Sequence, residues 1–188
     1  ATSPPAVMRV LQGCSPKKPT GEWTPSFLTP EQGAIVAAVA EIMIPRTDTP
    51  GAKDVGVPGF IDTILRDAYP KHDQDRYLTG LEQFDDQARK AHGKAFVEIE
   101  PQQQTALVRE FHDAAVKAAR EQELVDTRDE RPFILMTKEL TMLGFFTSEA
   151  GATQVLQYVA VPGPFRGCLP LTEAGNGKTW ATEMSQAF

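Results

Sequence analysis

The fold is decided first by residues 29–45, which read TPEQGAIVAAVAEIMIP. Thr29 can cap a helix, Pro30 suits the first helical position, and Gln32 stands where the partner of a capping box belongs. Apolar side chains then recur at helical spacing, at Ile35, Val36, Val39, Ile42 and Met43. Pro45 stops the run. This stretch therefore predicts a helix that opens at Pro30 and ends before Pro45.

Working outward, the same kind of pattern recurs along the chain. It predicts a helix from Val57-Pro58, one from about Asp73 to His92, one from Glu100-Pro101, one from near Arg131-Pro132, and a short last helix after Ser148-Glu149 that reaches Val155 or Leu156. Alternation with a period of two residues is weak throughout, so no sheet of consequence is expected. The chain is predicted to be all-α, an irregular bundle of about five to six helices.

Proline and glycine gather near the two ends of the chain and are nearly absent from residues 70–148. This distribution predicts one domain with an N-terminal arm over residues 1–28, a helical body over residues 29–157, and an extended C-terminal arm over residues 158–188. The C-terminal arm is apolar, with Val159, Val161, Phe165, Leu169, Leu171, Trp180 and Phe188. Such an arm must cover apolar surface, either on its own bundle or on another protein.

Composition excludes some classes of partner. The 188 residues are 41% hydrophobic and 23% charged, with a formal net charge of −6 and no cluster of Lys and Arg. A nucleic-acid partner is not expected, because neutralising phosphates requires a concentrated basic face. No run approaches the roughly 20 apolar residues that cross a bilayer, so no membrane span is expected.

The chain has two cysteines, Cys14 and Cys168, and starts at Ala1 rather than Met. The first residue indicates either that a leader has been removed, which we expect, or that the chain has been trimmed. The two cysteines are either unrelated free thiols or partners in one disulfide. We favour the disulfide, which requires an oxidising compartment. A disulfide closing this long loop would stabilise the fold by roughly 5 kcal/mol in the chain-entropy model. A third reading is lipidation of Cys14, because Leu11-Gln12-Gly13-Cys14 is similar to a lipobox.

Motifs for chemistry are absent from the sequence. It contains no G-x-G-x-x-G, G-x-x-x-x-G-K-[ST], C-x-x-C-H, G-x-S-x-G or H-E-x-x-H. The histidines, His72, His92 and His112, are spread over the predicted helices and are expected on surfaces or at caps rather than as a metal site. The densest carboxylates are Asp85-Asp86 and Asp126, Asp129 and Glu130, which are expected to be solvated.

Several runs resemble the gluconate 2-dehydrogenase subunit 3 family over about residues 27–170. At the N-terminal side these are Phe27–Gln32, the run IMIPRTDTPGA at 42–52, and VGVPGFID at 55–62. At the C-terminal side they are Phe145–Gly151, Tyr158, Val161-Pro162-Gly163 and Gly167-Cys168. The run at 44–52 is the most specific, whereas residues 70–130 match only in their helical pattern.

The resemblance implies a non-catalytic small subunit of a periplasmic FAD-dependent sugar or polyol dehydrogenase. Its catalytic partner would be a flavoprotein of the glucose–methanol–choline (GMC) oxidoreductase type, often with a multihaem cytochrome c as a further subunit. FAD would lie in the partner and haem c in the cytochrome, with no cofactor in this chain. Members typically bear the twin-arginine leader with which the catalytic subunit is exported. The resemblance also supports a pairing of Cys14 with Cys168.

The family supplies no catalytic residue, so the expected site is an interface. Aromatic and arginine anchors dominate the energetics of many interfaces. We therefore expect Phe165, Arg166 and Trp180 to contact the partner, together with Val161 and Leu169. Two alternatives remain: a free-standing helical enzyme that uses His112 and nearby carboxylates, and a transient assembly or export chaperone that leaves the final complex.

Overall fold

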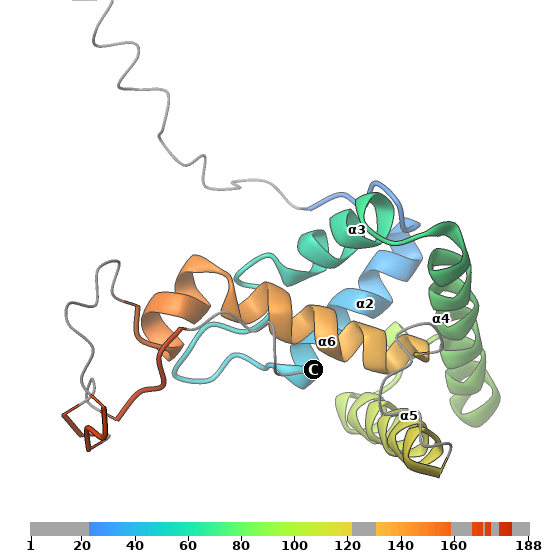
Figure 1. Cartoon of the computed structure of the whole chain (residues 1–188). Helices are drawn as coiled ribbons and strands as arrows, with labels where there is room; N and C mark the ends of the chain where they lie inside the picture. Colours follow the sequence, from blue (N-terminus) through green and yellow to red (C-terminus); the bar gives the residue numbers. More distant parts are fainter. Residues whose placement is uncertain (1–22, 122–130, 159–166, 171, 174–176, 182–188) are drawn as a thin grey trace, which may run out of the picture.

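The computed structural model describes residues 23–121, 131–158, 167–170, 172–173 and 177–181. Its elements are α2 (Pro30–Met43), α3 (Val57–Asp67), α4 (Lys71–His92), η2 (Phe96–Glu98), α5 (Pro101–Glu121), α6 (Phe133–Phe146) and η4 (Gly151–Val155). Within these residues there is no strand, and a single β-bridge joins Gln157 to Trp180. The predicted all-α fold is confirmed (Figure 1).

Helix α2 begins with the capping box that its sequence predicts. The Gln32 backbone N–H donates to Thr29 Oγ1 at 3.2 Å, and the Thr29 backbone N–H donates to Gln32 Oε1 at 3.0 Å. Two of the helix's unpaired N-terminal donors are thereby satisfied. The helix ends at Met43, before Pro45, because proline cannot continue the hydrogen-bond ladder.

The other helix starts follow from local chemistry, with one correction. Helices α3 and α5 begin at Val57 and Pro101 as predicted, and α6 begins at Phe133, directly after Pro132. Helix α4 begins at Lys71 rather than at Asp73, because Pro70 occupies the N-cap position in extended backbone without any side-chain cap. The predicted start there was two residues late.

The short last helix forms where it was predicted, but it is a π-helix. The N-cap position is Ala150, which provides no side-chain cap, but the Gly151 backbone N–H donates to Ser148 Oγ at 3.0 Å, so Ser148 pairs the first backbone donor of this helix. A Cβ atom on Gly151 would lie only 2.0 Å from the carbonyl oxygen of Phe145. Only glycine allows the chain to turn this closely after α6.

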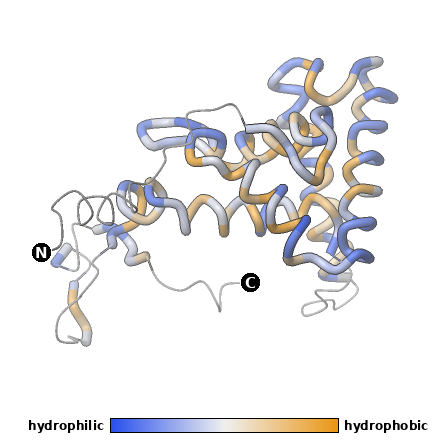
Figure 2. The backbone as a smooth tube through the Cα atoms, turned by 90° about the horizontal axis from the view of Figure 1, so that it is seen from above, coloured by the Kyte–Doolittle hydropathy of each residue, from blue (hydrophilic) through white to orange (hydrophobic). Residues whose placement is uncertain are grey.

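Helix α6 lies at the centre of the body and contacts α2, α3, α4 and α5 (Figure 1). Its buried residues share one half of the helix surface: Phe133, Ile134, Met136, Thr137, Leu140, Thr141, Gly144 and Phe145. The other half is also mostly apolar but only partly buried, and it carries Glu139 and the exposed Lys138. The four neighbouring helices therefore bury one broad face of α6. By contrast, hydrophilic residues occupy much of α4 at the edge of the molecule (Figure 2).

Two glycines bring neighbouring helices close to α6. A Cβ atom on Gly144 would lie 2.6 Å from Cδ1 of Phe60, and one on Gly80 would lie 2.6 Å from Cβ of Phe133. The missing side chains make room for a phenylalanine in each case. The close contacts of α6 with α3 and with α4 therefore depend on these two positions.

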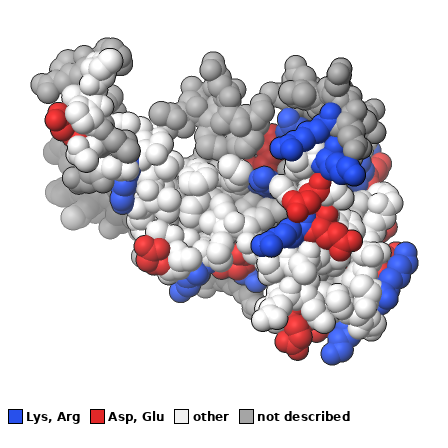
Figure 3. Space-filling view, turned by 90° about the horizontal axis from the view of Figure 1, so that it is seen from below, with Lys and Arg blue, Asp and Glu red and all other residues white. Residues whose placement is uncertain are grey.

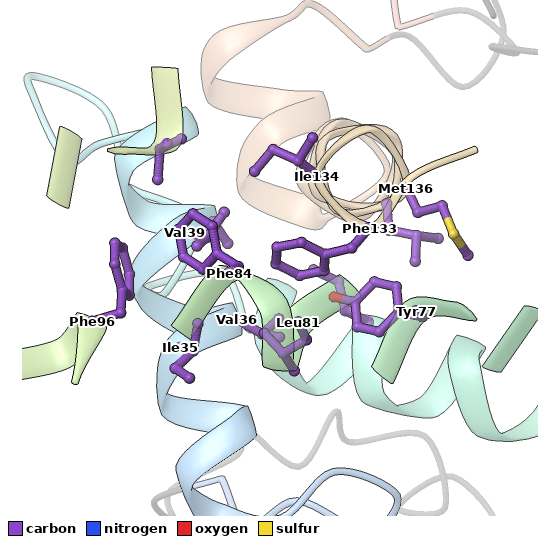
Figure 4. Packing of buried hydrophobic residues seen from close by; sticks show 14 of the residues in the cluster. Ile35, Val36, Val39, Tyr77, Leu81, Phe84, Phe96, Phe133, Ile134 and Met136 are labelled. Carbon is purple, nitrogen blue, oxygen red and sulfur yellow. The ribbon is translucent and has the colours of Figure 1, made fainter. Parts of the chain in front are cut away.

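Aromatic rings join α4, α5 and α6 through Phe84. Its ring centroid lies 4.7 Å from that of Phe96, 4.9 Å from that of Phe111 and 5.6 Å from that of Phe133. Tyr77 meets Phe133 edge-to-face at 5.2 Å. Figure 4 shows the Phe84 and Phe133 rings side by side among the aliphatic side chains of α2. Offset and tilted contacts of this kind add to the free energy of burial.

A buried carboxylate ties the segment before α2 to helix α3. Asp62 is 1% exposed and accepts the backbone N–H groups of Ser26 at 2.8 Å, Phe27 at 3.1 Å and Leu28 at 2.8 Å. It also accepts the Ser26 hydroxyl at 2.8 Å, and Arg66 Nη1 donates to that same hydroxyl oxygen at 2.6 Å. Sequence analysis did not single out Asp62 for this role.

Burial alone would raise the pKa of Asp62. The hydrogen bonds from the Leu28 and Ser26 backbone, the Ser26 hydroxyl and the Phe27 backbone outweigh that effect, so the pKa lies below its ordinary value. Asp62 therefore stays ionised when buried and stabilises the fold above the pKa of an unfolded aspartate.

Trp23 packs between α2 and α3. A Cβ atom on Gly33 of α2 would lie 3.0 Å from Trp23 Cη2, and one on Gly59 of α3 would lie 3.0 Å from Trp23 Cδ1. Leu28 is buried in the core. The described part of the predicted N-terminal arm therefore packs on the helical body.

Two buried threonines one turn apart on α6 differ in their hydrogen bonds. Thr137 Oγ1 donates to the Phe133 carbonyl at 2.9 Å and lies 2.9 Å from the Tyr77 hydroxyl, which therefore donates to it. Burial raises the pKa of Tyr77 and keeps it protonated. Thr141 Oγ1 is buried with no hydrogen-bond partner among the described residues.

These threonines should respond oppositely to valine. Thr137→Val leaves the buried Tyr77 hydroxyl unpaired and should cost about 1–3 kcal/mol of unfolding free energy. Thr141→Val removes an unpaired hydroxyl at nearly constant shape and should be neutral or stabilising by up to about 1 kcal/mol. Urea denaturation of both variants measures the difference; equal destabilisation would contradict the assigned bonds.

Asp62→Asn should lower the free energy of unfolding by about 2–4 kcal/mol, because the amide NH₂ cannot accept the donors that a carboxylate accepts. The folded-state pKa of Asp62 is lowered, so its stabilisation is present above about pH 4 and disappears as the pH falls through the folded value. Denaturation measured from about pH 2 to about pH 7 should show that the free energy of unfolding depends less on acid pH in the variant than in the unaltered protein.

The matched control is Asp86→Asn, at an exposed position on α4. It should change stability by less than about 0.5 kcal/mol. An Asp62→Asn variant as stable as this control at neutral pH would contradict the role given to Asp62.

Candidate functional site

The run IMIPRTDTPGA forms the connection between α2 and α3, and its chemistry is structural. The Glu41 carboxylate accepts the backbone N–H of Arg46 at 3.1 Å and that of Lys53 at 2.9 Å. A Cβ atom on Gly51 would lie 2.4 Å from Glu41 Oε1 and 2.7 Å from the Arg46 nitrogen. Glycine is therefore required at this point of the loop.

An ion pair closes the same loop. Arg46 Nε donates to Asp54 Oδ2 at 2.7 Å, and a second guanidinium nitrogen contacts Asp54 Oδ1. Asp54 also accepts the Gly51 N–H at 2.8 Å. The Arg46 side chain and the Gly51 N–H hold the pKa of Asp54 below its ordinary value. Arg46 of this run and Asp54, two residues after its end, thus fix the loop between α2 and α3.

The C-terminal arm is pinned to the end of η4 by a short bridge. The Gln157 N–H donates to the Thr179 carbonyl at 2.9 Å, and the Ala181 N–H donates to the Gln157 carbonyl at 2.9 Å. Lys178 Nζ donates to the Gln154 carbonyl at 2.6 Å. Residues 167–170 and 177–181 consequently lie at the end of the molecule opposite α4 (Figure 1).

The arm exposes large apolar side chains. Tyr158 is 61% exposed, Leu169 is 41% exposed and Trp180 is 38% exposed. In the described part of the chain, the remaining large hydrophobic residue with comparable exposure is Val97, on η2. Exposed apolar groups gathered in one region mark a contact surface more often than isolated ones do.

The structure describes only some of the predicted interface residues. Leu169 and Trp180 lie on the arm and are exposed, as an interface requires. Val161, Phe165 and Arg166 lie outside the described residues, so their roles stay predictions. Tyr158 was quoted for the family resemblance but not as an interface residue, although it is the most exposed aromatic of the described chain.

Cys168 is exposed and adopts a left-handed backbone conformation, with φ of 55°. Its proposed partner, Cys14, lies outside the described residues. The disulfide therefore stays a prediction.

The neighbouring carboxylates Asp85 and Asp86 have different surroundings in the fold. Asp85 accepts the Phe96 N–H at 2.7 Å and the Arg89 side chain at 2.9 Å, whereas Asp86 is exposed. Asp85 therefore positions η2 against α4. Asp126, Asp129 and Glu130 lie outside the described residues.

The histidines do not meet one another. His72 and His92 lie at opposite ends of α4, and His112 lies on α5. In the part of the chain that the structure describes, no three His, Cys, Asp or Glu side chains are arranged to hold a metal ion.

His112 instead meets a lysine from the next helix. Its Nε2 lies 2.9 Å from Nζ of Lys138 on α6, and its Nδ1 lies 3.1 Å from Oδ1 of Asp113. Sequence analysis missed this contact, because His112 and Lys138 are far apart in the sequence. The signal available was the spacing of Arg109 and His112, which places both on one face of α5.

The fold and the site together describe a small helical body to which an apolar arm with exposed side chains is fixed. Comparison with family profiles gives the narrower assignment: residues 30–163 match the profile of gluconate 2-dehydrogenase subunit 3. The chain belongs to this family, as the resemblance indicated.

Two further comparisons give no relatives. No curated protein and no solved structure matches the chain. Among the helices that the structure describes, none combines the length and the apolar character that crossing a bilayer requires.

The pairing of Cys14 with Cys168 predicts a measurable covalent link. The intact protein should be lighter than its reduced form by two hydrogen atoms, and a tryptic digest without reductant should contain the linked peptides. Cys168→Ser and Cys14→Ser should each destabilise the oxidised protein by about 3–5 kcal/mol, and the double variant should add nothing further. Two free thiols titrating in the native, unreduced protein would contradict the pairing.

Proposed function

We propose that this chain is the non-catalytic small subunit of a periplasmic FAD-dependent sugar, polyol or glycoside dehydrogenase. It binds and stabilises a catalytic flavoprotein of the GMC oxidoreductase type, and it accompanies that subunit through twin-arginine export. The observation that carries the proposal is the apolar arm with exposed Tyr158, Leu169 and Trp180, fixed to the body of a gluconate 2-dehydrogenase subunit 3 protein.

The arm suits an obligate interface. Burying an exposed aromatic side chain releases free energy in proportion to the apolar area removed from water, about 25 cal/mol per Å². The body supplies rigidity, because the Gln157–Trp180 bridge fixes the arm before a partner binds. Pre-fixed backbone reduces the entropy that association costs. Obligate interfaces often bury about 2,000 Å² or more in total, which requires further contacts beyond this arm.

Cofactors are assigned to other chains under this proposal. FAD would be held by the flavoprotein, and haem c by a cytochrome subunit where one is present. The sequence of this chain has neither the glycine-rich loop that cradles a dinucleotide nor the motif that attaches haem c.

The alternative of a free-standing enzyme centres on His112. A general base in a hydrolase needs one imidazole nitrogen free to accept a proton from the nucleophile. Here the Lys138 ammonium donates to Nε2, and Asp113 accepts at Nδ1. Both nitrogens are engaged, so the observed arrangement favours binding over proton transfer.

Co-expression tests the proposal directly. The proposed flavoprotein partner should accumulate as soluble, FAD-loaded enzyme when both chains are expressed, and its yield should fall at least about tenfold when this chain is omitted. Replacing both Tyr158 and Trp180 by alanine should weaken retention of the flavoprotein about tenfold or more, since truncating interface aromatics commonly costs about 2 kcal/mol each.

Val97→Ala is the control, because Val97 has an exposed fraction between those of Trp180 and Tyr158 but lies on η2, away from the arm. It should leave retention unchanged. Normal yield and activity of the flavoprotein expressed without this chain would contradict the proposal. Size-exclusion chromatography of the active enzyme separates the resident subunit, which co-elutes, from a transient chaperone, which does not.

A further inference from the structure

A groove lies between the end of α2, the middle of α5 and α6, apart from the C-terminal arm. Its volume is about 290 Å³. Aliphatic and thioether side chains form most of its wall: Ile42, Met43 and Ile44 beside Val108 and Met142. Methionines make an adaptable apolar wall, because their unbranched side chains adjust to the shape of what they contact.

Three basic side chains complete the wall. Arg109 and His112 come from one face of α5, and Lys138 comes from α6. No Asp or Glu lines the groove. Glu139, next to Lys138 in the sequence, is engaged by Arg131. In a chain with a net charge of −6, this groove therefore carries a local excess of positive charge.

The hydrogen bonds define what the cations offer. The Lys138 ammonium has three N–H donors and gives one to Nε2 of His112, which leaves two for a ligand. The Nδ1 atom of His112 accordingly carries its proton and donates to Asp113. These two hydrogen bonds fix the imidazole ring of His112 and the ammonium group of Lys138 side by side in the wall of the groove. Arg109 makes no ion pair with any carboxylate among the described residues.

The groove fits a carboxylate that is flanked by apolar side chains. Its volume is at the lower limit of the roughly 300–1,000 Å³ that encloses a free ligand, so a protruding side chain suits it better than a free molecule. A polyhydroxylated sugar acid is a poor fit, because the wall is mostly apolar and Thr105 is its one polar side chain besides the three basic ones.

The groove belongs to the side of the body that includes α5. On this lower side, Lys and Arg gather with Asp and Glu toward one edge, and the middle is largely uncharged (Figure 3). A partner that crosses this face meets mostly uncharged surface in the middle and charge at the margin, and charged residues are likewise depleted from the core of protein interfaces.

We propose that this groove is a second docking point for the catalytic flavoprotein. It receives an acidic segment of that subunit, which places one Asp or Glu side chain against Arg109 and Lys138 and an adjacent aliphatic or aromatic side chain against Met43 and Met142. This inference rests on the proposed function and adds a contact that does not involve the arm. Charge complementarity orients the partner, and the apolar wall supplies burial.

Zero-length cross-linking of the purified two-subunit complex tests this contact. A water-soluble carbodiimide joins lysines to carboxylates that lie within ion-pair distance. We expect mass spectrometry to find Lys138 linked to an Asp or Glu of the flavoprotein. Lys138→Arg keeps the charge but removes the reactive amine, so it should abolish this link and preserve the complex. Lys90, exposed in the last turn of α4, should form no such link.

Charge reversal gives an independent measure. The double variant Arg109→Glu and Lys138→Glu should weaken binding of the flavoprotein about tenfold or more, with a smaller dependence on salt than the unaltered complex. Lys90→Glu should leave the affinity unchanged. Circular dichroism of each isolated variant ensures that the comparison is made between folded chains.

The outcomes separate this inference from the function on which it rests. If the complex forms but Lys138 links to no partner carboxylate, or if charge reversal leaves the affinity unchanged, the docking point is wrong and the proposed function stands. If no complex with a flavoprotein forms at all, both are overturned.

Discussion

The structure depends on one constraint: helix α6 has a broad apolar face that must be kept from water. It lies in the middle of the body, and α2, α3, α4 and α5 bury this face. Two of these come close because Gly144 and Gly80 make room for Phe60 and Phe133. With this face of α6 buried, the π-helix that begins at Gly151 sets the direction in which the chain leaves the body, and hence where the exposed arm begins.

Local signals in the sequence predicted the helices well. The capping box at Thr29 and Gln32 and the proline at position 101 act within one turn, so they are readable without the fold. The start of α4 was missed because Pro70 caps it by backbone geometry alone. The role of Asp62 was missed because its donors lie more than thirty residues earlier and meet it only after folding.

Only part of the candidate interface could be predicted from the sequence. The segment with Leu169 and Trp180, both exposed, could be predicted because it is apolar, rich in proline and unable to form a helix. The groove with His112 and Lys138 could not be predicted, because two helices must pack before these side chains meet. The run that best identifies the family forms an ion-paired loop between α2 and α3. The run that identifies the family thus consists of scaffold residues, whereas the contacts proposed for a partner lie on the exposed arm and in the basic groove.

Native mass spectrometry of the affinity-tagged chain, purified from a host that carries its neighbouring genes, tests the central claim most directly. The account predicts one dominant species in which this chain accompanies a larger, FAD-bearing chain at a fixed ratio and separates from it only on denaturation. Recovery of this chain solely as an isolated polypeptide, with the flavoprotein active and unaccompanied in the same extract, would contradict the account.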